Sequence, residues 1–436
     1  MKKQIRPGGV HGTVSIPASK SHTIRALLLA ATAAGESTID NWLASADTES
    51  CIDVLSQLGV RITKTAPDSC GATATLCVNG IGPHLNPSEA PLDCGNSGTT
   101  LYLSMGLAAL QPRRVSFTGD EQLQRRSAEP LLAALEQGGV TVTRDNGSCV
   151  PFSLEGPFAA KGAGDGGGAD PVRIEIACPT SQYLSALLLA APLTERGLSI
   201  TVPLLNERPY VDLTLGWLER HGVRFERGGY SHFTVPGGQA YRPMKVSIPG
   251  DYSSATFFAV AAAATGSTLT LAGLDPDDAQ GDKEVLTILK QLGASVEQNE
   301  AGFTISGPSQ LSGGDIDLNA MPDALPALAI AGSVCSSALR LINVPQARAK
   351  ETDRIRVMRE VVEALGGKAD ELAEGLIVYP GQLRGGVVDS YGDHRVAMAA
   401  SIAGLVAQEP VTVTNADVAT ITFPGFYELL EACRDT

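Results

Sequence analysis

Six segments of this 436-residue chain repeat one pattern, and this repetition limits the possible folds more than any other feature. Each segment opens with polar residues, continues as an apolar helix of about three turns, and ends in a turn and an alternating strand. The segments lie at residues 19–41, 96–119, 180–202, 251–273, 322–344 and 392–415. Ordered self-similarity of this kind indicates an array of related structural units.

A second pattern alternates with the first, a helix that ends in a glycine turn followed by a short strand. Clear examples are "VDLTLGWLERHGVRFE" (211–226) and "DKEVLTILKQLGASVE" (282–297). Together the two patterns predict six units of roughly 70–80 residues, each strand–helix–strand–helix–strand in outline. The first helix of each unit is apolar nearly all round and is therefore expected to be buried; these helices begin near residues 21, 99, 181, 254, 323 and 394.

These units predict an α/β fold with two domains of three βαβαβ-type repeats each. Parallel helices would lie inside and sheets outside, which makes each domain an inside-out α/β barrel. We assign residues 19–241 to an upper domain and residues 1–18 and 242–436 to a lower one, because "GGQAYRPM" (237–244) suits a crossing between domains. The first strand, within Gln4–Ile16, is expected to pair with the second half.

The polar helix starts would then gather at one end of each domain and face a cleft between the domains. The N-terminus of a helix offers free backbone N–H groups and the positive end of its dipole. Six such ends directed at one cleft predict a binding site for anions.

Composition and charge exclude several other classes of protein. The chain is 43% hydrophobic and only 5% aromatic, and its net charge of −14 argues against a nucleic-acid-binding surface. Lys2, Lys3 and Arg6 are followed by no apolar signal-peptide core, and the longest apolar stretches are too short to span a membrane. We therefore expect a cytoplasmic protein that binds neither nucleic acid nor membrane.

The cysteines and histidines do not indicate a metal site. The eight cysteines, Cys70 among them, include no CxxC pair, and the six histidines include no HExxH spacing, so we expect reduced thiols and no metal. Gly162, Gly164 and Gly167 have GxGxxG spacing, but they lead into a strand and not into a helix. This glycine-rich stretch is interpreted as a loop and not as a dinucleotide fingerprint.

Three further segments place charged residues at the convergent ends of the repeats: "MPDALPALAI" (321–330), "AKETDRIRVMRE" (349–360) and "YGDHRVAM" (391–398). On a helix, Lys350 and Glu351 would lie four and three residues before Arg354 and face one cleft with it. Taken alone, Asp323 would be explained as a helix cap. Its coincidence with the other two segments favours a functional role.

Eight motifs along the entire chain resemble those of the enolpyruvyl transferase family, and specifically of its 5-enolpyruvylshikimate-3-phosphate synthases (3-phosphoshikimate 1-carboxyvinyltransferases). In chain order they are "PASKSHTIRALLLAA", "CGNSGTT", "TSQYLSALLLAAP", "RPYVDLTL", "GDYSSATFF", "PDALPALA", "KETDRIR" and "GDHRVAM". The resemblance implies two domains that close around shikimate 3-phosphate and phosphoenolpyruvate. It implies transfer of the enolpyruvyl group to the 5-hydroxyl through a tetrahedral intermediate, with loss of phosphate and no cofactor.

The resemblance also implies which residues bind the substrates. Shikimate 3-phosphate would contact Lys20, Ser21, Arg25, Thr180, Ser181, Gln182, Tyr210, Asp323, Gln346 and Lys350. Phosphoenolpyruvate would contact Lys20, Gly98, Arg126, Gln182, Arg354 and Arg395. Asn96, Thr99 and His394 would line the same cleft.

Three residues are implied to act in catalysis. Asp323 would accept the proton of the attacking hydroxyl. Glu351 and Lys20 are alternatives for proton exchange at the phosphoenolpyruvate methylene. A monomer is the expected state, and the two substrates are the expected partners.

The chain departs from the family pattern at several positions, namely Tyr102, Ser127, Glu207, Gln346 and Ile421. Tyr102 and Ile421 stand where an arginine and a lysine are usual, and the loss of one cation weakens anion binding by roughly one to a few kcal/mol. Glu207 replaces a serine that often contacts the substrate phosphate, and Gln346 replaces an asparagine. Ser127 replaces a proline, which leaves Arg125 as an alternative to Arg126.

Two other functions remain as alternatives. One is the related enolpyruvyl transferase that acts on UDP-N-acetylglucosamine, although "DEQLQRRSAEP" (120–130) lacks its reactive loop cysteine. The other is a non-catalytic member of the family. The presence of Lys20, Asp323 and Glu351 argues against it, because a protein without activity need not keep these acids and bases.

Overall fold

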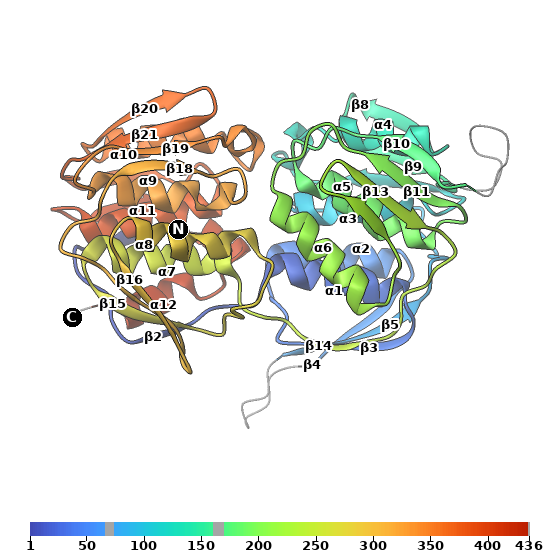
Figure 1. The fold of residues 1–436 in the computed structure, drawn as a ribbon, viewed down its shortest axis with the longest axis horizontal. Helices are drawn as coiled ribbons and strands as arrows, with labels where there is room; N and C mark the ends of the chain where they lie inside the picture. The colour runs from blue at the N-terminus through green and yellow to red at the C-terminus, as the bar shows by residue number, and fades with distance from the viewer. Residues whose placement is uncertain (66–73, 160–169, 435–436) are drawn as a thin grey trace. The chain divides into compact units, whose positions relative to one another are not determined.

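The computed structural model describes residues 1–65, 74–159 and 170–434. Cys70 and the glycines at 162, 164 and 167 lie outside these ranges. The chain divides into two compact units, one of Met1–Ala18 with Pro249–Thr436 and the other of Ser19–Ile248. Figure 1 shows both units, coloured along the chain. Among the described residues, no helix has the length and apolar character needed to cross a membrane.

One repeat shows how the units with four-stranded sheets are built. β6 (Leu92–Asp93), α3 (Gly98–Ala108) and β7 (Arg114–Thr118) form a parallel crossover, and α4 (Glu129–Gln137) leads to the hairpin of β8 (Thr141–Asn146) and β9 (Cys149–Glu155). The sheet order is β6-β7-β9-β8, so β9 inserts between β7 and β8. This hairpin adds a strand to the outline expected from the sequence, because the chain turns back after β8 and forms β9 beside it.

The unit of Ser19–Ile248 holds two more sheets of this kind, β14-β3-β5-β4 and β10-β11-β13-β12. Their strands are β3 (Ala34–Asp40), β4 (Arg61–Thr65), β5 (Thr75–Ile81), β10 (Val172–Glu175), β11 (Gly197–Thr201), β12 (Glu226–Gly228), β13 (His232–Pro236) and β14 (Lys245–Ser247). The helices are α1 (Lys20–Thr32), α2 (Ala46–Gln57), α5 (Ser181–Ala190) and α6 (Arg208–Arg220), in addition to α3 and α4.

The other unit has three sheets, β16-β17-β15-β2, β18-β19-β21-β20 and β1-β23-β22. Their strands are β1 (Lys2–Ile5), β2 (Thr13–Ser15), β15 (Thr268–Ala272), β16 (Ser295–Asn299), β17 (Gly302–Ser306), β18 (Gly314–Asp317), β19 (Leu339–Ile342), β20 (Lys368–Leu372), β21 (Gly375–Tyr379), β22 (Gly386–Asp389) and β23 (Val411–Thr414). The helices are α7 (Tyr252–Thr265), α8 (Val285–Gln291), α9 (Leu325–Ser333), α10 (Arg354–Ala364), α11 (His394–Val406) and α12 (Phe426–Ala432).

Strand pairing decides to which unit the N-terminus and the crossing segment belong. The N-terminal stretch forms two short strands and not one: β1 pairs antiparallel with β23, and β2 pairs parallel with β15. β14 pairs parallel with β3. Residues 242–248, which the sequence analysis assigned to the lower domain, therefore lie in the unit of Ser19, and the chain leaves that unit after Ile248.

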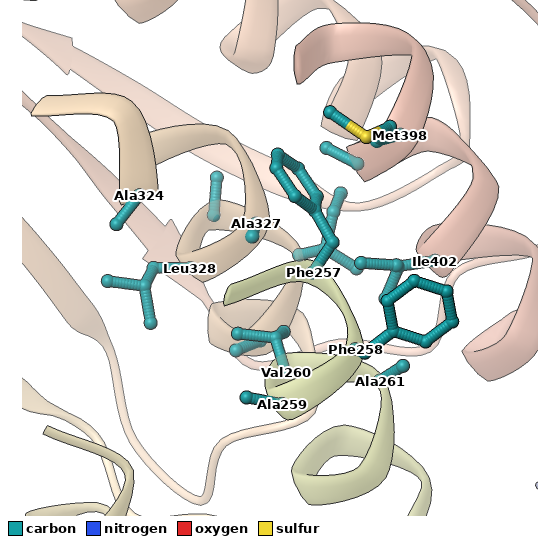
Figure 2. Packing of buried hydrophobic residues seen from close by; sticks show 14 of the residues in the cluster. Phe257, Phe258, Ala259, Val260, Ala261, Ala324, Ala327, Leu328, Met398 and Ile402 are labelled. Carbon is teal, nitrogen blue, oxygen red and sulfur yellow. The ribbon is translucent and has the colours of Figure 1, made fainter. Parts of the chain in front are cut away.

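The cores consist of the helices that the sequence marks as apolar on every side. In the unit of Pro249–Thr436, α7, α9 and α11 contact one another, and Figure 2 shows side chains from all three helices meeting. Phe257, Leu328 and Met398 are fully buried there. In the other unit, α1 contacts α3, and α3 contacts α5. Because each helix is covered on every face, the polar residues within it, such as Arg25 and Ser185, need hydrogen-bond partners inside the protein.

Gly106 permits one of these close helix contacts. A Cβ at this position in α3 would lie 2.5 Å from the backbone oxygen of Ala186 in α5. Glycine costs about 1 kcal/mol relative to alanine within a helix, so its presence here is explained by the approach of the two backbones. Backbone atoms cannot move aside as the end of a flexible side chain can.

We predict that Gly106→Ala lowers the free energy of unfolding by about 1–3 kcal/mol, because α3 and α5 must move apart. Gly216→Ala on α6 is the matched control, since a Cβ there has nothing within 4 Å. The control should raise stability by about 0.5–1 kcal/mol. Urea unfolding of both variants measures the difference, and an equally stabilised Gly106→Ala would contradict the packing argument.

Candidate active site

Five of the six apolar helices of the sequence repeats begin at a polar capping residue. Each cap side chain accepts a hydrogen bond from a backbone N–H of the first turn; the caps are Ser19, Ser97, Thr180, Asp251 and Asp393. The sixth helix, α9, is instead preceded by the 3₁₀ turn Pro322–Ala324. Capping satisfies donors that burial would otherwise leave unpaired. The polar starts of the sequence repeats are thus explained first by helix capping.

Arg354 joins three carboxylates at the helix starts of one unit. Its side chain is only 1% exposed. Its Nε lies 2.7 Å from Asp393 Oδ2, its Nη1 lies 2.6 Å from Asp323 Oδ1, and its Nη2 lies 2.5 Å from Glu351 Oε2. Nη2 also donates to Asp393 Oδ1 at 3.2 Å. One guanidinium therefore fixes acids from three separate sequence motifs.

Arg395 completes the environment of Asp323. Its Nη2 lies 3.0 Å from Asp323 Oδ2 and donates to Ser253 Oγ at 3.2 Å. Burial by itself would raise the pKa of Asp323, but the charges of Arg395, Lys350 and Arg354 together lower it well below its ordinary range. Burial would lower the pKa of Arg354, but Asp393, Glu351 and Asp323 raise it above the usual value. Asp323 is accordingly an ionised carboxylate at neutral pH.

The expected helical position of Lys350 and Glu351 needs correction, and the alternative of Asp323 as a helix cap can be set aside. Lys350 and Glu351 do not lie on a helix, because Asp353 caps α10 through the N–H of Arg356 and the helix begins only at Arg354. Glu351 still reaches Arg354 from the preceding turn. Asp323 is not a helix cap, because both of its carboxylate oxygens face arginines.

Two further predicted residues, and the departure at Ile421, also belong to this unit. Gln346 is buried in the 3₁₀ turn Pro345–Ala349, and its Nε2 donates to the backbone oxygen of Asn319 at 2.9 Å. His394 is buried at the first position of α11. Ile421, at the end of the 3₁₀ turn Ala416–Ile421, is half-buried and supplies no charge.

In the other unit, Lys20 is the first residue of α1 and is bound by a carboxylate. Its Nζ lies 2.8 Å from Asp47 Oδ2, and both side chains are largely buried. Asp47 is not among the residues predicted from the sequence. It stands in the first turn of α2, where acids are common because of the helix dipole, so the sequence contains no signal that separates it from an ordinary helix start.

Arg25 is buried among neutral acceptors. Its Nε donates to Thr214 Oγ1 at 2.9 Å, its Nη1 to the backbone oxygen of Ser21 at 3.0 Å, and its Nη2 to Ser185 Oγ at 3.3 Å and the backbone oxygen of Tyr210 at 3.4 Å. Burial lowers the pKa of Arg25 to about 10, and Tyr210 opposes this shift. The guanidinium therefore stays protonated at neutral pH, and its partners in these four bonds are uncharged.

The start of α5 holds a carboxylate in this structure. Glu207 Oε2 accepts hydrogen bonds from Thr180 Oγ1 at 2.9 Å and from both the N–H and the Oγ of Ser181 at 3.1 Å. The Gln182 amide donates to Thr180 Oγ1 at 3.3 Å. Thr180, Ser181 and Gln182, which are predicted to bind a phosphate, thus lie together. Glu207 accepts hydrogen bonds from the first two of them.

Arg126 is the arginine that turns toward the start of α3. Its Nη2 donates to Asn96 Oδ1 at 3.0 Å, and a Cβ at Gly98 would lie 3.1 Å from its Nη1. Thr99 follows, half-buried, in the first turn. Arg125 is 77% exposed and lies 3.9 Å from the exposed Glu121. The geometry therefore favours Arg126 over Arg125 as the arginine of the candidate site.

Tyr102 is buried one turn further along α3. Its hydroxyl donates to the backbone oxygen of Ser127 at 3.3 Å, and its ring meets that of Tyr183 edge-on at 5.1 Å. The residue is therefore part of the packing between α3 and α5 and holds the segment that follows Arg126.

Comparisons with known proteins cover nearly the whole chain. The sequence profile of EPSP synthase (3-phosphoshikimate 1-carboxyvinyltransferase) matches residues 5–430. A 3-phosphoshikimate 1-carboxyvinyltransferase from Acetivibrio thermocellus is 43% identical over 435 residues, covering 99% of this chain and 98% of the relative. The chain belongs to the EPSP synthase family.

Further members of the EPSP synthase family are also similar over nearly the whole chain. The enzyme of that name from Ruminiclostridium cellulolyticum is 40% identical over 432 residues, covering 99% of this chain and 98% of the relative. The solved structure of EPSP synthase from Acinetobacter baumannii superposes with a TM-score of 0.79 at 26% identity, covering 99% of this chain and 98% of that one. The predicted α/β fold of two repeat-built halves is confirmed by this likeness.

We predict that Arg354→Gln lowers the free energy of unfolding by about 3–5 kcal/mol at neutral pH, because three buried carboxylates lose their shared cation. Arg359→Gln is the matched control, since Arg359 lies on the same helix and pairs with Glu363 but is 29% exposed. Exposed pairs contribute about 0–1 kcal/mol. Urea unfolding of the two variants measures the contrast.

The loss of unfolding free energy in Arg354→Gln should also depend on pH. In the Arg354→Gln variant, Glu351 and Asp393 stay buried without this cation, and burial favours the protonated form of a carboxylate, so folding takes up a proton and is favoured as the pH falls. In the unchanged protein the depressed pKa of Asp323 costs stability only below about pH 4. The difference in stability should therefore shrink between about pH 8 and pH 5. A constant difference would argue against the carboxylate cluster as its cause.

Proposed function

We propose that this chain transfers the enolpyruvyl group of phosphoenolpyruvate to the 5-hydroxyl of shikimate 3-phosphate and releases inorganic phosphate. The observation that carries the proposal is the grouping of Asp323, Glu351, Arg354 and Arg395, which brings acids and cations from three sequence motifs within hydrogen-bond distance. Membership of the EPSP synthase family supplies the reaction class.

Shikimate 3-phosphate is proposed to bind to donors at several helix starts. Thr180, Ser181 and Gln182 at the start of α5 would hold its phosphate, because hydroxyl and backbone N–H donors at a helix N-terminus suit an anion. Arg25 adds a buried cation beside them, held by the backbone oxygens of Ser21 and Tyr210. The ring hydroxyls would contact Asp323, Gln346 and Lys350; Lys20 is proposed to reach both substrates.

Phosphoenolpyruvate is proposed to bind to Arg126, Arg354 and Arg395, with Lys20 and Gln182 beside them and the N–H of Gly98 at the start of α3. The planar fork of arginine matches carboxylate and phosphate oxygens. The close approach of Arg126 to Gly98 supports their joint use, because a side chain at that position would crowd the guanidinium. Asn96, Thr99 and His394 are proposed to line the site.

Asp323 is proposed as the base that takes the proton from the 5-hydroxyl. With both oxygens on arginines, it is a weak base, and general-base catalysis is most effective with a pKa near the operating pH. Phosphoenolpyruvate would draw Arg354 and Arg395 toward its own anionic groups. The pKa of Asp323 would then rise at the moment at which a base is needed.

Proton exchange at the methylene is proposed for Glu351 and Lys20. The hydroxyl oxygen bonds to C2 of phosphoenolpyruvate while C3 gains a proton and becomes a methyl group. Loss of phosphate from C2 and of a proton from C3 then restores the double bond in the product. Cations around the leaving group stabilise its charge when water is excluded.

We also propose that the enzyme acts as a monomer in the cytoplasm. The residues proposed for both substrates all come from one chain. The seven described cysteines are free thiols, which is typical of a reducing compartment.

The proposed reaction predicts that purified protein releases phosphate from phosphoenolpyruvate only when shikimate 3-phosphate is present. A coupled phosphate assay measures this directly. UDP-N-acetylglucosamine in place of shikimate 3-phosphate serves as the control substrate. Release with the nucleotide sugar, or with neither acceptor, would reject the proposed function.

The proposed roles predict that Asp323→Ala and Glu351→Gln reduce kcat by at least about a hundredfold, the scale of general acid–base catalysis. Binding of shikimate 3-phosphate should change far less, because Arg25 and the start of α5 remain. Glu374→Gln is the matched control, since Glu374 is exposed in the same unit. Titration calorimetry separates binding from turnover, and full turnover in either variant would exclude that residue from catalysis.

A further inference from the structure

Glu207 is a buried carboxylate whose position is not explained by its own helix. It is the residue before α6, has left-handed backbone angles of φ 57° and ψ 42°, and makes no side-chain capping bond to α6. Its side chain instead contacts the start of α5, 26 residues earlier in the chain. Only 3% of the residue is exposed.

The contacts of Glu207 use every hydrogen that the hydroxyls of Thr180 and Ser181 and the N–H of Ser181 can donate. A hydroxyl and a backbone N–H each carry one hydrogen. The hydroxyls of Thr180 and Ser181 and the N–H of Ser181 all donate to the single oxygen Oε2, at 2.9–3.1 Å. A second anion can receive none of these three bonds while the carboxylate remains.

Carboxylate and phosphoryl oxygens are alike to these donors, since both are anionic acceptors of the same short hydrogen bonds. A phosphoryl group placed at the start of α5 would also bring its negative charge against that of Glu207. The two anions therefore exclude each other both by shared donors and by charge.

We infer that Glu207 is an internal competitor of the substrate phosphoryl group and so a specificity-determining residue of the acceptor site. The inference rests on the proposed function, because Thr180 and Ser181 are the residues proposed to hold the phosphate of shikimate 3-phosphate. Binding of the phosphorylated substrate requires the carboxylate to leave Thr180 and Ser181. The apparent affinity for shikimate 3-phosphate is then lower than the intrinsic affinity. The reduction grows with the fraction of molecules in which Glu207 occupies these donors.

The decisive comparison is between shikimate 3-phosphate and shikimate, which lacks the phosphoryl group. Titration calorimetry without phosphoenolpyruvate measures both dissociation constants for the unchanged protein, Glu207→Gln and Glu207→Ser. We expect the constant for shikimate 3-phosphate to fall about three- to tenfold in Glu207→Ser and less in Glu207→Gln, whose neutral amide oxygen is a weaker acceptor. The constant for shikimate should stay the same.

Glu219→Gln is the matched control, because Glu219 is exposed on the same helix and its substitution removes the same charge. It should leave both constants unchanged. A similar gain in this control would assign the effect to net charge and overturn the inference. Unchanged or weaker binding of shikimate 3-phosphate in both Glu207 variants would also overturn it, since Glu207 would then support the donors and not compete for them.

A second measurement covers the case in which Glu207→Ser folds poorly. Removal of the carboxylate leaves three buried donors without an acceptor, so the Ser variant should melt at a lower temperature and recover when inorganic phosphate is added. Phosphate should raise the melting temperature of the unchanged protein by less. An equal rise in both proteins would contradict competition between Glu207 and phosphate. If the unchanged protein binds no shikimate 3-phosphate and releases no phosphate from phosphoenolpyruvate, the proposed function itself fails.

Discussion

The buried guanidinium of Arg354 is the interaction on which the arrangement of one unit depends. A carboxylate is costly to bury unless it is paired and hydrogen-bonded, and Asp323, Glu351 and Asp393 all lie against this one side chain. Arginine can serve three acids because it offers five N–H donors in a planar fork; a lysine offers three from a single point. The starts of α9, α10 and α11 are thereby held in fixed register.

The other unit manages its buried charge differently. Arg25 is desolvated among two hydroxyls and two backbone oxygens, so the positive charge is not neutralised by these partners. Its lowered pKa records the cost of burying a cation in this way. An anionic substrate would supply the missing charge. Glu207 modifies this picture, because the chain has placed a carboxylate of its own at the start of α5.

Much of the fold can be predicted from the sequence because it is encoded locally. A helix that is apolar on every side can only be buried, and a polar cap marks where it begins, so the starts of α1, α3, α5 and α11 follow from the repeats. The hairpin strand β9 lacks such a signal, and the sequence outline omits it. Long-range contacts are not encoded in the same way. Neither the pairing of Lys20 with Asp47 nor the turn of Glu207 away from its own helix can be predicted from spacing, since each depends on two elements meeting in space.

In the proposed function, the ion pairs also connect substrate binding to chemistry. Asp323 is stabilised as an ion by Arg395, Lys350 and Arg354, and the same charges that stabilise it make it reluctant to accept a proton. A second anion that competes for these cations removes part of that stabilisation and raises the pKa of Asp323. The base would therefore become effective only when phosphoenolpyruvate is bound. Arg354 is restricted in this exchange, because its bonds to Asp393 and Glu351 hold it in place, whereas the Arg395 guanidinium donates to Asp323 and Ser253. Arg395 is thus the cation better able to turn from the acid to the substrate.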